Sequence, residues 1–193
     1  MGRLITDGDL GGFPPGRGTW EPTVWRWAVT TFGAQSFLDI GCGPGHAVQF
    51  CHDLGLRAAG LDGSPKAFAM SPCPTRLEMH DFSRGEWPPN TPGIPSPAFD
   101  LVWSAEFVEH IEEKYLSNFL PAFATAQKAI LLLHGIPGQK GHHHVNCQPP
   151  EYWIGHLGRM GYRWDESATL AARPLSRFAN RGWGAKGLVF VPV

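Results

Sequence analysis

The stretch FLDIGCGPGH, residues 37–46, joins a short apolar run to three glycines at alternate positions. The apolar run ends at Ile40, and Gly41, Gly43 and Gly45 follow it. Glycines permit tight turning, and a helix that starts directly after such a turn offers free backbone N–H groups to a ligand. The stretch therefore predicts the first strand, loop and helix of a ligand-binding α/β sheet.

Strands and helices alternate on both sides of this glycine loop. Alternation of this kind builds a mostly parallel sheet with helices on both faces. The last two strands have no long helix between them, which suits an antiparallel edge. We therefore expect an α/β fold with a Rossmann-like, doubly wound, seven-stranded sheet whose C-terminal edge strand is antiparallel. The predicted strands are 36–40, 57–62, 75–81, 98–104, 128–135, 162–166 and 187–193, and the predicted helices are 21–33, 46–55, 65–71, segments within 106–127, and 149–161.

The bulk composition limits the possible partners. The chain has 193 residues, 42% of them hydrophobic, and 16 basic against 17 acidic residues give a net charge of −1. No run of five Lys or Arg occurs, so broad capture of nucleic acid or of a membrane is not indicated. Four scattered cysteines favour a reducing compartment, and no long apolar run occurs. We expect one cytoplasmic domain over 20–193, preceded by an irregular arm over 1–19, that acts on a small molecule as a monomer or weak homodimer.

Acidic residues stand at the carboxyl ends of the first three predicted strands. In a doubly wound sheet, ligands bind at this edge. Asp39 would repel a pyrophosphate but suits a ligand with an ammonium group. Asp62 can accept hydrogen bonds from two ribose hydroxyls, and Asp81 from an adenine amino group, with Phe82 beside the ring. Each aspartate alone could cap a loop, but the ordered set favours S-adenosylmethionine.

These motifs resemble those of class I S-adenosylmethionine-dependent methyltransferases over about residues 20–165. FLDIGCGPG is similar to the family's first motif, GLDGSP to its second, HDFS to its third and FDLVWSAEFVEH to its fourth, most closely in the broad methyltransferase domain 11/23 type. Trp20 stands where such enzymes often have an aromatic segment at the mouth of the site, although it could equally be core. The resemblance implies cofactor binding by Asp39, Gly41, Cys42, Gly43, Gly45, Asp62, Asp81, Phe82 and Ser104.

A second cluster follows the fourth predicted strand, in WSAEFVEHIEEKY (103–115). Glu106, Glu109 and His110 have the spacing i, i+3, i+4 and would share one face of a helix. Carboxylates and imidazole are ligands for divalent ions. The run His142–His144 follows the neighbouring fifth strand and could add a ligand at the same edge.

This cluster also resembles that of two subgroups, the small-RNA 2′-O-methyltransferases and the ubiquinone-pathway O-methyltransferases. Both use a metal ion to hold and acidify a substrate hydroxyl. The resemblance implies that Glu106, Glu109, His110 and one of His143 and His144 are metal ligands. Two other interpretations stay open: a metal-free role in which His110 is a general base or orienting group, and a purely structural role.

The chemistry of the cluster favours a hydroxyl as methyl acceptor, because a hydroxyl with a pKa of about 10 or more needs a base or a Lewis acid at neutral pH. We therefore predict O-methylation of a small molecule or sugar, in a pocket built by the N-terminal arm and by the 84–98 and 135–150 segments. An RNA 2′-O-methyltransferase or an N-methyltransferase is the alternative, although WSAE lacks the Asn/Asp-Pro-Pro-Tyr pattern of enzymes that methylate amino groups of nucleic acids. A non-catalytic S-adenosylmethionine-binding protein and a nicotinamide dehydrogenase are the rivals. His46 replaces the third glycine of the dinucleotide motif, which disfavours the dehydrogenase.

Overall fold

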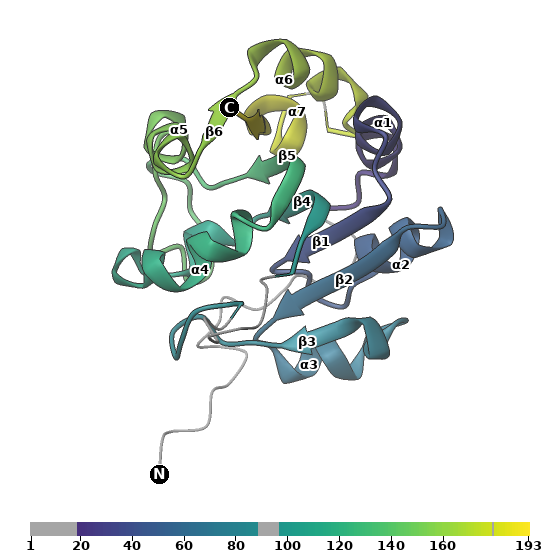
Figure 1. The fold of residues 1–193 in the computed structure, drawn as a ribbon. Helices are drawn as coiled ribbons and strands as arrows, with labels where there is room; N and C mark the ends of the chain where they lie inside the picture. The colour runs from purple at the N-terminus through teal and green to yellow at the C-terminus, as the bar shows by residue number, and fades with distance from the viewer. Residues whose placement is uncertain (1–18, 89–96, 179) are drawn as a thin grey trace.

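The computed structural model describes residues 19–88, 97–178 and 180–193, in which a twisted sheet lies between two helical layers (Figure 1). The sheet of these described residues has seven strands in the order β3-β2-β1-β4-β5-β7-β6. Strands β1 to β5 are parallel, and β7 is antiparallel to both β5 and β6. The doubly wound sheet is confirmed, with its antiparallel strand one position inside the edge. The strands are β1 (Ser36–Ile40), β2 (Arg57–Asp62), β3 (Leu77–Met79), β4 (Phe99–Ala105), β5 (Ala126–Leu133), β6 (Tyr162–Trp164) and β7 (Leu188–Pro192).

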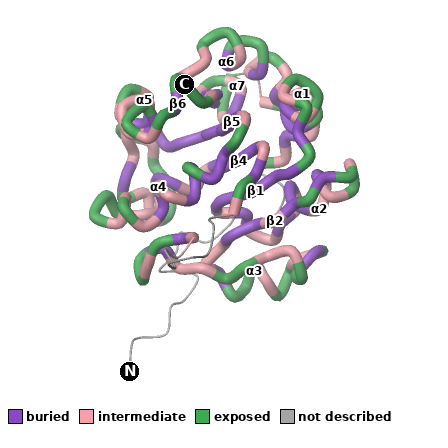
Figure 2. Tube along the Cα trace, viewed as in Figure 1, coloured by how far each residue is buried: buried purple, intermediate pink, exposed green. Residues whose placement is uncertain are grey.

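Two hydrophobic clusters cover the two faces of the sheet. Neighbouring residues of a strand point to opposite faces, so Trp103 of β4 belongs to one cluster and Val102 to the other. Both faces are buried, which is why the strands read as continuous apolar runs, and Figure 2 shows them at the centre of the molecule. Helices α1 (Pro22–Phe32), α2 (His46–Asp53), α6 (Glu166–Ala172) and α7 (Gly182–Lys186) contribute to the first cluster, and α4 (Leu116–Phe123) and α5 (Pro150–Arg159) to the second.

Most predicted elements are present with shorter bounds. Helix α1 ends at Gly33, which has a left-handed conformation (φ 56°), as the C-cap pattern predicts. The third predicted strand is reduced to β3, because residues 74–76 form a 3₁₀ turn. The helix predicted over 65–71 is α3 (Pro65–Ala69), with Ser64 capping the N–H of Ala67.

The C-terminal helices α6 and α7 were not predicted. Helix α7 has the sequence GWGAK, and two glycines in five residues oppose an isolated helix. Its Trp183 is 1% exposed and packs on Trp103 with ring centroids 4.8 Å apart, so tertiary packing stabilises the turn. Helix α7 reaches the carboxyl end of β4, where Lys186 contacts Glu106.

The described helices are all short, and none of those in the described ranges is long and apolar enough to cross a membrane. The predicted N-terminal arm lies outside the described residues, apart from Thr19. The same holds for residues 89–96 of the proline-rich segment that follows the third strand.

Candidate active site

A cavity of about 850 Å³ opens at the carboxyl ends of the parallel strands. The cavity is lined by the glycine loop, the ends of β2 and β4, the residues before α1, the loop before α5, Phe178 and residues 181–183. The strand order reverses between β1 and β4, and a doubly wound sheet binds ligands at such a reversal. The volume lies near the top of the range of about 300–1,000 Å³ for small-molecule sites. The cavity can therefore hold two small molecules side by side.

Two of the predicted cofactor residues do not line this cavity. Ser104 is fully buried in β4, and its hydroxyl donates to the carbonyl oxygen of Ile40 at 2.9 Å, which ties β4 to β1. Gly45 (φ 80°) precedes α2, and a Cβ there would lie 2.8 Å from Leu77 Cδ2. Both hold the framework of the site. The predicted residues that do line the cavity are Asp39, Gly41, Cys42, Gly43, Asp62, Asp81 and Phe82.

The carboxylate of Asp62 organises the glycine loop. Its Oδ2 accepts from the Gly43 N–H and its Oδ1 from the Ser64 N–H, each at 2.8 Å. The N–H groups of Gly41 and Cys42 both donate to the carbonyl oxygen at the end of β2, at 2.9 and 3.0 Å. A carboxylate can accept about four hydrogen bonds. Asp62 can therefore shape the loop and accept from hydroxyls of a ligand.

Asp39 is a buried carboxylate in the wall of the cavity, 4% exposed. Burial, and then the charge of Asp62, raise its pKa well above the ordinary value for aspartate. A nearby positive charge would offset both effects, because it stabilises the ionised carboxylate. This part of the cavity thus suits the ammonium group of a ligand.

Phe107 is a cavity residue that the sequence did not indicate. Gly41 has φ 76°, and a Cβ there would lie 2.6 Å from the Phe107 side chain. Phe82 packs against Phe107 with ring centroids 5.5 Å apart, and Asp81 forms an ion pair with Arg84 at 3.0 Å. Phe107 sits between two glutamates in the sequence, and only the fold shows that its ring covers the first glycine.

The segment after β4 is not the predicted helix. Glu106 has a left-handed backbone (φ 54°), and the chain then makes a single 3₁₀ turn, Val108–His110. The Glu106 N–H continues the sheet by donating to the carbonyl oxygen of Leu133 at 3.1 Å. The expectation that residues 106, 109 and 110 share one face of a helix is therefore wrong. The left-handed residue and the turn bring the two glutamates together instead.

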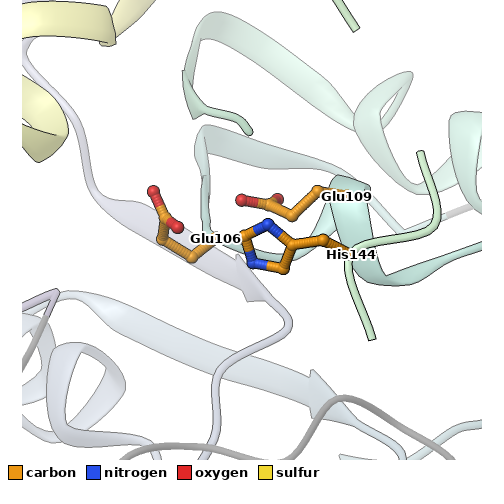
Figure 3. Close-up of side chains that lie close together, drawn as sticks. All are labelled: Glu106, Glu109 and His144. Atoms are coloured by element: carbon orange, nitrogen blue, oxygen red, sulfur yellow. The ribbon is translucent and has the colours of Figure 1, made fainter. Parts of the chain in front are cut away.

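Glu106, Glu109 and His144 form the ligand cluster, in which one donor atom of each lies within 4.8 Å of the others (Figure 3). They come from the end of β4, from the 3₁₀ turn and from the loop before α5. Of the two histidines left open by the sequence, the structure brings His144 to the glutamates. His143 has a left-handed backbone (φ 53°), and its carbonyl oxygen accepts from His110 Nδ1 at 3.2 Å.

Glu109 is the most unusual group of the ligand cluster. Its side chain is wholly buried, and neither carboxylate oxygen has a hydrogen-bond partner among the described residues. Burial, and then the charge of Glu106, raise its pKa to about 8. A buried carboxylate without donors is costly unless a cation or a proton satisfies it. The cluster therefore fits a bound cation, and in its absence Glu109 holds a proton at neutral pH.

His110 lies beside the ligand cluster and lines the cavity. Its ring packs edge-on against that of His144, with centroids 4.9 Å apart. Burial, and then the neighbouring His144, lower its pKa, so the imidazole is neutral at neutral pH. The sequence offered His110 both as metal ligand and as base. In the structure His144, and not His110, has a donor atom close to both glutamates, and both histidines line the cavity.

A lysine from α7 also reaches the ligand cluster. Lys186 Nζ lies 3.5 Å from Glu106 Oε1 and donates to the side-chain oxygen of Gln139. The Gln139 amide in turn donates to Glu106 Oε2 at 3.2 Å. No local sequence pattern links these residues, because they belong to segments that are far apart in the chain.

Residues 38–125 match a family model described as a methyltransferase domain. This span runs from β1 to the residue before β5 and contains the glycine loop, Asp62, Asp81 and both glutamates of the ligand cluster. The matched span is thus similar to a methyltransferase domain, as its motifs predict, and the fold described above agrees with this match. The match favours methyl transfer over the nicotinamide dehydrogenase that the sequence left as a rival. No curated protein matches the sequence significantly.

Solved methyltransferase structures share the fold of this chain at low identity. An S-adenosylmethionine-dependent methyltransferase from Archaeoglobus fulgidus is 15% identical and matches over 96% of each chain, with a TM-score of 0.62. Magnesium protoporphyrin IX methyltransferase from Synechocystis PCC 6803, solved with bound S-adenosylmethionine, is 15% identical over 89% of this chain and 76% of its own (TM-score 0.60). A TehB-like methyltransferase from Corynebacterium glutamicum is 20% identical over 91% and 90% (TM-score 0.58). At these identities the comparison establishes the fold, so the acceptor has to be inferred from the cavity itself.

Proposed function

We propose that this protein is a methyltransferase that transfers the methyl group of S-adenosylmethionine to a hydroxyl of a small molecule. The observation that carries the proposal is Glu109, a wholly buried carboxylate without a hydrogen-bond partner in the described part of the chain. It stands behind Glu106, which lines the cavity. Burial of an unpaired carboxylate costs folding free energy. A metal ion bound by such a carboxylate would help to remove the proton of an acceptor hydroxyl, which would explain why the group is present.

The donor would occupy the part of the cavity beside β1, β2 and the segment after β3. Asp39 suits the ammonium group of its amino-acid end, and Asp62 the ribose hydroxyls. Asp81 and Phe82 suit the adenine ring. The glycine loop would contact the donor through the backbone of Gly41, Cys42 and Gly43, because their small side chains let the donor come close.

The ligand cluster fits a divalent metal ion, since two carboxylates and an imidazole are a common ligand set for such ions. Glu106, Glu109 and His144 would hold the ion, which would lower the pKa of the acceptor hydroxyl. Gln139 and Lys186 already restrain both carboxylate oxygens of Glu106. This support would hold Glu106 in a fixed position beside the acceptor.

His110 would take the proton. Its Nδ1 faces the carbonyl oxygen of His143, which can only accept, so this nitrogen carries hydrogen. The other ring nitrogen, Nε2, is then the basic one. A neutral imidazole in the cavity wall can remove the hydroxyl proton as the acceptor oxygen bonds to the methyl carbon.

The alternatives fit these observations less well. RNA binding relies on several phosphate contacts, yet of the described Lys and Arg residues only Arg181 lines the cavity. A neutral amine acceptor has a free lone pair and does not need its proton removed before attack. N-methylation would therefore leave the buried glutamate without a use.

Two measurements test this proposal. Calorimetry with S-adenosylhomocysteine should show binding that falls at least about tenfold in Asp62→Ala, because the variant loses the anchor of the glycine loop at Gly43 and the carboxylate that suits the ribose hydroxyls. Transfer of labelled methyl groups to a panel of phenols and sugars should be lost in Glu109→Gln, whereas the exposed Glu112→Gln, a matched control, should retain it.

Full transfer activity in Glu109→Gln would remove the basis for the proposal. Activity that survives exhaustive chelation, but disappears in His110→Gln, would assign proton removal to His110 alone.

A further inference from the structure

One cationic side chain lines the cavity among acidic ones. Arg181 is the only Lys or Arg of the described residues in its wall, which also contains Asp39, Asp62, Asp81 and Glu106. Arg181 is exposed, and its guanidinium carbon lies 4.7 Å from the centre of the Phe178 ring. No carboxylate of the described residues forms an ion pair with it. The arginine is therefore held in place by an aromatic ring, and its positive charge is available to a ligand.

Arg181 stands where the cavity meets a second, open groove of about 630 Å³. Glu106, Arg181 and Gly182 line both spaces. The groove continues along Gln139 and Lys186, and no residue of the glycine loop or of the Asp62 and Asp81 segments reaches it. It thus leads outward from the ligand cluster, away from the residues that suit the donor.

The charge pattern of this outer end is specific. Lys186 is engaged by Glu106 and Gln139, so among the described residues of this end Arg181 is the cation without an acidic partner. The acidic residues of the cavity would repel an anion, so an anionic ligand needs a directed contact to bind. A guanidinium supplies it, because its planar fork matches carboxylate and phosphate oxygens. Stacking on Phe178 orders the arginine before the ligand arrives.

The cavity as a whole has aromatic walls that suit a planar molecule, and Phe178 lies at the Arg181 end. Trp20, Phe107 and Phe178 line the cavity and are all partly exposed, so their rings can contact a bound molecule. Aromatic rings favour stacked or edge-on contacts with other rings. An aromatic body between the ligand cluster and Arg181 would satisfy both the apolar and the charged parts of the surface.

We propose that the methyl acceptor is an aromatic hydroxy acid. Its anionic group, a carboxylate or a phosphate, pairs with Arg181 at the mouth of the groove, and its hydroxyl lies beside Glu106 and His110. This inference rests on the proposed O-methylation, because that reaction requires the acceptor hydroxyl to lie beside Glu106 and His110. The anion site itself is independent of the chemistry and can be measured by binding alone.

The test uses three probes that share a 4-hydroxyphenyl ring and differ in charge: 4-hydroxybenzoate, 4-hydroxyphenyl phosphate and the neutral 4-hydroxybenzyl alcohol. Each is titrated calorimetrically into protein saturated with S-adenosylhomocysteine. We expect at least one acid to bind wild type about tenfold or more tightly than the alcohol, and Arg181→Gln to abolish that preference. Which acid is preferred distinguishes a carboxylate site from a phosphate site. Arg177→Gln is the matched control, because Arg177 is exposed and does not line the cavity.

Three results would overturn the inference: no measurable binding of either acid, equal affinity for acids and alcohol, or an acid preference that Arg181→Gln retains. A second arm titrates S-adenosylhomocysteine alone, for which we expect a change of less than twofold in Arg181→Gln. A large loss there would assign Arg181 to the carboxylate of the donor. An acid preference without methyl transfer would leave the anion site intact and count against the proposed function only.

Discussion

The buried carboxyl group of Glu109 makes the metal-free protein less stable as the pH rises. Its pKa is about 8 in the folded protein, against an ordinary value of 4.5. Between these values the folded state holds a proton that the unfolded chain has released, so the unfolded state binds fewer protons. Stability is therefore fully present below about pH 4.5 and falls as the pH rises towards 8.

The size of this loss of stability follows from the difference between the pH and the ordinary pKa of 4.5. Each pH unit costs about 1.4 kcal/mol, so at pH 7 the carboxyl costs about 3 kcal/mol relative to a side chain that does not ionise. Glu109→Gln removes this cost without a change in volume, and its amide can donate to Glu106. In the presence of a chelator we expect the variant to be more stable at pH 7 by up to about 3 kcal/mol, or roughly 6–12 °C in Tm.

Urea unfolding of wild type and Glu109→Gln at pH 5 and pH 8, in chelator, measures the difference directly. The advantage of the variant should be below about 1 kcal/mol at pH 5 and largest at pH 8. Adding a divalent metal ion should then stabilise wild type and not the variant. The reasoning is refuted if Glu109→Gln is the less stable protein at pH 8, or if the difference does not grow with pH. The exposed Glu112→Gln should show no such dependence.

Three further changes test other parts of the site. Gly41→Ala places a Cβ 2.6 Å from Phe107 at a left-handed backbone position, and we expect a loss of about 1–3 kcal/mol in chemical denaturation; an unchanged midpoint would contradict the contact. Ser104→Ala removes the hydrogen bond to β1 and should cost about 1 kcal/mol of stability while calorimetry shows unchanged S-adenosylhomocysteine affinity; weaker binding would instead make Ser104 a cofactor contact. Because the pKa of His110 is lowered, kcat/KM of wild type should fall only when the pH drops below that lowered value and the base is protonated. His110→Gln should be slow at every pH and should not show this fall at low pH. The same fall at low pH in the variant would exclude His110 as the base.

Local patterns in the sequence were sufficient for the scaffold. The apolar run before Gly41 predicts a buried strand, and the acidic residues at positions 39, 62 and 81 mark the ends of three strands or the segments just beyond them. These features depend on neighbours within a few residues, so they are visible in the chain itself. Helix α7 escaped prediction because its stability comes from the packing of Trp183 and not from its own composition.

For the acidic segment after β4, the sequence correctly predicted that Glu106 and Glu109 lie close together, but it wrongly predicted that a helix brings them together. Helical spacing suggested that Glu106, Glu109 and His110 act together. The left-handed Glu106 breaks the helix, and the resulting turn pairs the glutamates with His144 and turns His110 towards the cavity. Backbone conformation at one residue, which propensity does not reveal for glutamate, decided this arrangement.

Local sequence patterns suffice to predict the class of sheet, the position of the glycine loop and the three aspartates that suit a methyl donor, since each follows from neighbouring apolar and turn-forming residues. The arrangement of the proposed acceptor end depends on the packing of distant segments. His144 reaches Glu109, Lys186 reaches Glu106, and Arg181 reaches the mouth of the cavity. These residues meet because β4, β5 and α7 pack together, and contacts between segments distant in the chain are set by packing that no short pattern contains.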